Sequence, residues 1–256
     1  MTGQALAVAR RILAELARTR RSLVFWAIFP GLMLLLFGLI YAGRSGDTAA
    51  SFDTTAPGIL IGAALFFSCL GGPIAVMVAE RERRTLRRLL VSPLHPAAYF
   101  LGIVLAFLAI AAGQTAIVYG VAWFFGGRFH GNPGLGALVV LLSVFSYVGL
   151  GFFFGARLAR RAEDVNGPVA AFGVPLLVLG GTFFPVSLLP DYLLRLVWLD
   201  PVFHMNQALK GVSARGWSWE EAGLHLAVLG LFTALALLLG VRSYRHLLAQ
   251  EKQGRP

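Results

Sequence analysis

The feature that most constrains this chain is a series of apolar runs, each close to 20 residues or longer. Hydrophobic residues make up 57% of the sequence and charged residues only 13%, whereas soluble domains carry about 45–50% and about 25%. About 20 apolar residues are enough for one helix to cross a bilayer. Inside the bilayer every backbone N–H and C=O must bond within the protein, and a helix achieves this alone. We therefore expect an all-α integral membrane protein.

The hydropathy pattern predicts six transmembrane helices preceded by an amphipathic one. Residues 1–21 interleave five arginines with Leu6, Ile12, Leu13 and Leu16, a pattern typical of a helix in the membrane interface; the alternative is a solvated tail. We expect residues 22–256 to form the transmembrane domain. Its predicted spans are 22–42, 57–79, 97–125, 134–156, 169–184 and 222–241.

Basic residues divide unequally between the two sides of this topology. Seventeen of the 22 Lys and Arg residues fall in the N-terminal segment, the loops after spans two and four, and the C-terminal tail. The other side holds five, while the acidic residues divide equally. Cytosolic segments of membrane proteins carry such an excess. We predict that both termini are cytosolic, and that the net charge of +10 reflects orientation rather than binding to nucleic acid.

The loop at residues 80–96 is the densest charged segment. Leu86, Leu89 and Leu90 have the i, i+3, i+4 spacing of an amphipathic helix, and Pro93 ends it because proline disfavours helical geometry in the residue before it. Positive-inside bias explains the arginines but not the leucines, so we predict a helix that docks on another protein; the alternative is a generic basic loop. The residues assigned to docking are Glu80, Glu82, Arg83, Thr85, Leu86, Arg87, Leu89, Leu90, Ser92 and Pro93.

A second unusual segment follows span five, at residues 185–215. A Gly-Gly-Thr-Phe-Phe-Pro motif interrupts the apolar run before it, and prolines at 190 and 201 lie on either side of the apolar patch 193–199. We predict two short re-entrant helices that dip into the outer leaflet and return, where protein or water satisfies the non-helical backbone; the alternative is an exposed loop. The candidate gate residues are Gly180, Gly181, Phe183, Phe184, Pro185, Leu189 and Pro190.

The sequence lacks the motifs for ATP binding, metal binding and ion coupling. The only lysines, Lys210 and Lys252, do not follow a glycine, so we predict no P-loop, no enzymatic activity and no cofactor in this chain. The five histidines are scattered and Cys69 is the single cysteine, so we predict no metal site. No carboxylate lies mid-span, which disfavours an ion-coupled pump.

Mild polar side chains and glycine pairs remain within the predicted spans. The polar groups suit the route of an amphiphile better than that of an ion; alternatively, they bond between helices. The GxxxG pairs at 58/62 and 151/155 would permit close helix approach within the chain. The polar side chains are Ser68, Gln114, Thr115, Ser143, Ser146 and Tyr147.

The interfacial helix, the six spans and two motifs together resemble the type-2 ATP-binding-cassette (ABC) exporter permeases, which include daunorubicin-resistance and polysaccharide-export permeases. The motifs are E-R-E-x-x-T-L-x-x-L-L-x-S-P at 80–93 and G-G-x-F-F-P…L-P at 180–190. The chain departs from the family at Arg84 and Arg87, where Gly and Glu are common, so its loop is more basic.

The resemblance implies an export permease in the bacterial inner membrane that moves an amphiphilic, drug-like or lipid-linked substrate out of the cytosol. The partners it implies are a second permease half, identical or not, and ATPase subunits that hold the ATP and Mg. The loop at 80–96 would be the coupling helix to the ATPase. Two alternatives stay open: a stand-alone secondary transporter of a small solute, and an assembly factor that transmits ATPase motion without transport.

Overall fold

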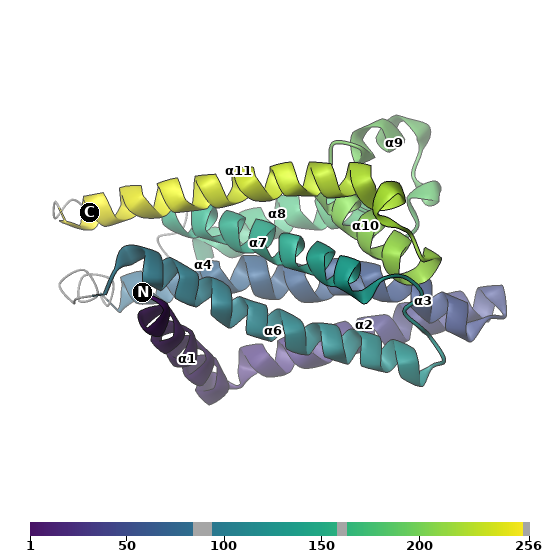
Figure 1. The fold of residues 1–256 in the computed structure, drawn as a ribbon, viewed down its shortest axis with the longest axis horizontal. Helices are drawn as coiled ribbons and strands as arrows, with labels where there is room; N and C mark the ends of the chain where they lie inside the picture. Colours follow the sequence, from purple (N-terminus) through teal and green to yellow (C-terminus); the bar gives the residue numbers. More distant parts are fainter. Residues whose placement is uncertain (84–93, 158–162, 253–256) are drawn as a thin grey trace.

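A computed structural model describes residues 1–83, 94–157 and 163–252, with side chains except at 163–168, 172 and 250–252. The regular structure of these residues is helical throughout, and most of the helices run along one long axis (Figure 1). Both termini lie at one end of the bundle, and helices α9 and α10 lie at the opposite end. The all-α prediction is therefore confirmed.

Helix α1 (Thr2–Thr19) is the predicted amphipathic helix. Its apolar face is buried at Ala5, Val8 and Ile12 and packs on α6 (Pro96–Phe124), where Gly102 leaves room for Val8. Arg20 (φ +51°) then makes a sharp turn into α2 (Arg21–Ser45). The apolar face thus contacts protein; the location of α1 in a membrane interface stays a prediction.

The second predicted span belongs to one continuous helical stretch, Thr48–Glu82, much longer than 57–79. It comprises α3 (Thr48–Ile59), the π-helix η1 (Leu60–Leu70) and α4 (Gly71–Glu82). Asp47 caps its start by accepting a hydrogen bond from the Ala50 amide at 3.0 Å. Threonine hydroxyls in the first turns bond back to carbonyls four residues earlier, so this polar stretch remains helical. Most of the stretch is buried at the centre of the bundle.

Helices α6, α7 (Pro133–Arg157) and α11 (Trp219–Lys252) match three other predicted spans. The α7 and α11 backbones approach closely, since a Cβ on Gly240 would lie 2.5 Å from the Gly149 carbonyl oxygen. Helix α11 continues to Lys252 instead of ending near residue 241, because charged residues such as Arg242 and Arg245 favour a helix although they end the apolar run.

Five helical segments in the described part of the chain are long and apolar enough to cross a membrane: α2, Thr48–Glu82, α6, α7 and α11. The predicted fifth span differs. Helix α8 (Glu163–Leu179) ends before Gly180, and its apolar portion, Val169–Leu179, is shorter than the other spans. The predicted interruption at Gly180–Gly181 is therefore confirmed, whereas a sixth full-length span is not.

Two short helices follow within the segment predicted to hold two. They are α9 (Asp191–Val197) and α10 (Pro201–Arg215), and a single 3₁₀ turn, η2 (Val186–Leu188), precedes them. The re-entrant depth of these helices in a bilayer stays a prediction.

Candidate functional site

Three of the predicted docking residues lie in the described part of the chain. Glu80 and Glu82 stand on the last turn of α4, and Arg83 is its C-cap. Helix α4 ends, and α6 begins, at the end of the bundle that carries both termini (Figure 1). The other seven docking residues lie outside the described residues: Thr85, Leu86, Arg87, Leu89, Leu90, Ser92 and Pro93.

Glu80 is buried, with 6% of its surface exposed, and holds several helices together. Its carboxylate forms an ion pair with Arg11 of α1 and accepts a hydrogen bond from the Tyr99 hydroxyl of α6. Tyr99 in turn stacks on Tyr244 of α11, with ring centroids 5.6 Å apart. We call these four residues the loop-root cluster. Glu82 and Arg83 are exposed.

Glu80 stabilises the positive charge of Arg11. Burial lowers the pKa of the Arg11 guanidinium, but the charge of Glu80 and the hydrogen bond to it raise it by more, so that the net shift is upward. The two charges therefore stabilise each other, and each would be costly if left alone.

A second contact ties the same turn of α4 to α7. Arg81 donates a hydrogen bond to the Ala156 carbonyl oxygen at 2.7 Å, one of the carbonyls that a helix leaves without a partner at its C-terminus. Through Glu80 and Arg81, the root of the loop is therefore attached to α1, α6 and α7.

The predicted gate motif lies at the opposite end of the bundle and is tightly held. Gly181 adopts φ +68°, a left-handed conformation that favours glycine. Asn206 of α10 donates to the carbonyls of Gly180 and Gly181 at 2.9 and 2.7 Å. A Cβ on Gly58 would lie 2.3 Å from the Thr182 carbonyl oxygen. The first GxxxG pair thus admits the segment after α8, whereas the second packs α7 against η1 and α4.

The aromatic part of the motif packs against α2. Tyr41 donates to the Phe183 carbonyl at 2.8 Å, and the Phe37 ring lies 5.7 Å from Phe183 and 5.6 Å from Phe184. Pro185 and Pro190 flank η2, and Leu189 is its C-cap. Phe183 and Phe184, together with Gly181 and Pro185, therefore form one surface with the end of α2.

A cavity of about 530 Å³ opens on this surface, bounded by the end of α2, the start of α3 and the gate motif. Two cationic side chains, Arg44 and Lys210, line it. Burial, assisted by the nearby charge of Arg215, lowers the pKa of Lys210. The remaining lining residues are Tyr41, Ser45, Ala50, Ser51, Thr54, Thr55, Gly181, Thr182, Phe183, Phe184, Pro185 and Leu188.

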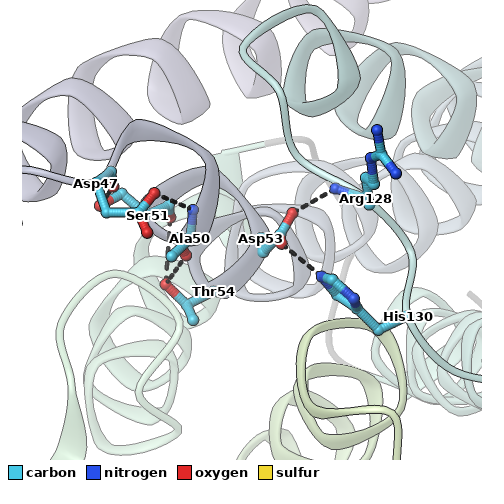
Figure 2. A network of polar contacts seen from close by, with 7 residues as sticks. All are labelled: Asp47, Ala50, Ser51, Asp53, Thr54, Arg128 and His130. Carbon is cyan, nitrogen blue, oxygen red and sulfur yellow. Dashed lines mark hydrogen bonds and ion pairs between the residues drawn. The ribbon is translucent and has the colours of Figure 1, made fainter.

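Asp53 of α3 anchors the loop between α6 and α7 at the same end (Figure 2). One carboxylate oxygen accepts the Arg128 backbone N–H at 2.6 Å, and the other is 2.8 Å from His130 Nε2. The Arg128 side chain points away from this contact. The His130 backbone also donates to the Ser213 carbonyl of α10 at 2.8 Å, so α3, α10 and the loop are joined.

The polar groups inside the spans mainly bond to protein. Ser68 of η1 donates to Gln114 of α6 at 2.7 Å, and Gln114 donates to the Trp26 carbonyl of α2 at 2.9 Å. Ser146 of α7 pairs with Thr233 of α11 at 2.8 Å. Thr115, Ser143 and Tyr147 bond to backbone carbonyls. Hydrogen bonding between helices therefore describes Ser68, Gln114, Ser146 and Tyr147, whereas Thr115 and Ser143 bond to carbonyls of their own helices.

The contact between one pair of histidines could not be predicted from the sequence. His204 and His225, taken as scattered, face each other with their Nδ1 atoms 2.9 Å apart. His204 Nε2 lies 3.0 Å from the Trp198 carbonyl, and the Trp198 and Trp217 rings both stack nearly parallel to His225. Twenty-one residues separate the histidines, and no local spacing indicates the contact.

A bundle with five helical segments long and apolar enough to cross a bilayer, among the residues that the structure describes, defines a polytopic membrane protein. The family model of the ABC-2 type transporter matches residues 3–212, most of the chain, so the protein belongs to that family.

Curated relatives agree with this assignment. The chain is 31% identical over 134 residues to the probable multidrug ABC transporter permease YbhR of Escherichia coli strain K12, covering 52% of this chain and 36% of YbhR. It is 25% identical over 170 residues to the inner membrane transport permease YhhJ of the same strain, covering 64% and 45%. The matches thus span less than half the length of these relatives.

Proposed function

We propose that this chain is the permease subunit of an ABC exporter, moving an amphiphilic, drug-like or lipid-linked substrate out of the cytosol with ATP that a separate subunit hydrolyses. Family membership and the names of the relatives, a multidrug permease and a transport permease, favour export over the alternatives. The proposal includes a second permease half and ATPase subunits that bind the ATP and Mg. The membrane is the bacterial inner membrane.

The observation that carries the proposal is the anchoring of the loop root. A docking helix transmits movement only if its base moves together with the spans. Glu80 and Arg81 join the end of α4 to α1, α6 and α7. A push on residues 80–96 would therefore shift several helices together, while Leu86, Leu89 and Leu90 would supply the apolar contact with the ATPase.

We place both termini and the loop at 80–96 in the cytosol, following the distribution of basic residues. In this arrangement α8 is a short fifth span, and α9 and α10 re-enter from the outer side. Cys69 is buried, so an Arg88→Cys variant carries one accessible thiol for labelling. An impermeant thiol reagent should label it only after the cells are permeabilised; labelling in intact cells would overturn the orientation and the docking role together.

Docking itself is tested by Leu89→Asp, which places a charge on the predicted apolar face. We expect the variant to insert and fold but to lose co-purification with its ATPase. The matched control is Leu199→Asp, the same substitution at an exposed residue (80% exposed) of the opposite end, which should co-purify normally. Unchanged co-purification of Leu89→Asp would remove the docking claim, and ATP-independent transport by the chain alone in vesicles would favour the secondary transporter.

A further inference from the structure

The cavity beside the gate motif carries two positive charges without negative partners. Arg44, at the end of α2, and Lys210, on α10, both line it. Within the described part of the chain, the ion pairs are Arg11 with Glu80 and His130 with Asp53, so neither cavity cation has a carboxylate. Lys210 is half-buried, and an unpaired ammonium in that position is costly to keep charged. An anion entering the cavity would remove this cost.

The hydroxyl groups around the cavity already use their protons. Tyr41 donates to the Phe183 carbonyl, Ser51 to the Asp47 carbonyl at 2.7 Å and Thr55 to the Ser51 carbonyl at 2.6 Å. Each hydroxyl has one proton to donate, so these groups can accept from a ligand but not donate to it. The side-chain donors left for an anion are therefore the ammonium of Lys210 and the guanidinium of Arg44.

Apolar side chains line the cavity together with the exposed Arg44. Phe184 and Leu188 line it, with 47% and 70% of their surfaces exposed. A cavity lined by both cationic and apolar side chains matches a molecule with a charged head and a hydrophobic chain, because the head can pair with the cations while the chain covers the apolar side chains.

We propose that this cavity binds the anionic headgroup of an amphiphile, with Lys210 and Arg44 on the headgroup and Phe184 and Leu188 against the start of its apolar chain. If the bound ligand is the transported substrate, the substrates of the proposed exporter are acidic amphiphiles. Only this identification of the ligand as substrate rests on the proposed function. The binding itself does not depend on the ATPase.

The test measures binding to the purified full-length chain in a neutral detergent by isothermal titration calorimetry. The probe is dioctanoyl phosphatidylglycerol, with dioctanoyl phosphatidylcholine as the zwitterionic arm and glycerol 3-phosphate as the soluble arm. We expect saturable binding of phosphatidylglycerol, weakened about tenfold or more by Lys210→Gln or Arg44→Gln, the loss of one charge-assisted hydrogen bond. Size-exclusion profiles check that the variants stay folded.

Arg128→Gln is the matched control, since it removes a positive charge at the same end from a side chain that does not line the cavity. It should bind the probe like the unmodified chain. Unchanged affinity in both cavity variants, or equal affinity for phosphatidylcholine, would overturn the proposal. Equal affinity for glycerol 3-phosphate would show that the apolar chain contributes nothing and would overturn the assignment to an amphiphile.

This experiment separates the site from the exporter function. Leu89→Asp should bind phosphatidylglycerol normally even if it loses its ATPase. Failed lipid binding with intact, Leu89-dependent co-purification would reject the cavity and retain the exporter. Lipid binding by a chain that transports alone in vesicles without ATP would keep the ligand site but reject the ABC exporter.

Discussion

At one end of the bundle a buried charge is paired, whereas two cations that line a cavity at the other end lack a carboxylate partner among the described residues. At the end with the termini, Glu80 is buried and satisfied by Arg11 and Tyr99. At the opposite end, Arg44 and Lys210 face a cavity without a carboxylate among the described residues. A buried charge that is paired holds helices together, whereas a charge that lines an open volume and lacks a carboxylate partner is suited to a ligand. The comparison separates structural charges from binding charges.

The largest effect should come from breaking the paired end. Glu80→Ala removes the partner of Arg11 and leaves the Tyr99 hydroxyl unsatisfied, so we expect a loss of about 3–5 kcal/mol in the free energy of unfolding. Thermal unfolding in detergent, calibrated with denaturant, measures it. Glu82→Ala, an exposed carboxylate two residues away, is the control and should change stability little. Equal losses in the two variants would mean that the loop-root cluster does not hold the helices.

The next largest loss of stability should come from disturbing the packing of the gate motif at the opposite end. A Cβ on Gly62 would lie 2.7 Å from the Thr182 side chain, so Gly62→Ala should cost about 1–3 kcal/mol through overpacking. The control is Gly113→Ala in α6, where nothing lies within 4 Å and alanine should be neutral or stabilising. If Gly62→Ala unfolds at the same temperature as the unmodified chain, the gate motif is not held by this contact.

Asp200, which caps α10, gives a pH-dependent test. Burial raises its pKa to about 7, against the opposing effect of the Val202 amide, and its Oδ2 atom is buried without a partner. The folded protein therefore keeps a proton that the unfolded chain has lost, so stability should fall as pH rises from about 4 to about 7 and then level off.

Asp200→Asn should retain the cap and abolish this slope. At pH 8 the variant should be more stable than the unmodified chain by about 1–2 kcal/mol, because it no longer buries a negative charge. Unfolding midpoints across pH measure the difference, with Asp191→Asn, an exposed residue, as control. A slope that survives in Asp200→Asn would assign the pH dependence to another group.

The smallest effect concerns the exposed ion pair in Figure 2. Asp53→Asn loses the charge opposite His130 but keeps an oxygen for the Arg128 amide. Because 48% of the His130 side chain is exposed, we expect a loss of only about 0.2–1 kcal/mol in unfolding free energy. Asp47→Asn exchanges one good N-cap for another and should be neutral. A loss as large as that of Glu80→Ala would contradict the contrast between the paired cluster and this contact.

Local pattern predicted most of the helices but set some of their limits wrongly. Apolar length identified α2, α6 and α7 to within three residues at each end. The predicted spans are shorter than Thr48–Glu82 and α11, because an apolar run ends at the first polar residues. A helix continues through polar residues that favour helical geometry. The predicted fifth span extends past the observed helix end at Leu179, because the phenylalanines beyond Gly181 are apolar but not helical.

The sequence by itself determined that this chain is an all-α membrane protein with a charged loop at one end and a broken fifth span, because hydrophobic length and glycine–proline interruptions act locally. Tertiary structure alone decided that Glu80 meets Arg11 and Tyr99, that Thr182 fits against Gly58 and Gly62, and that Lys210 shares a cavity with Arg44. These residues are far apart along the chain, and their meeting depends on how the helices pack.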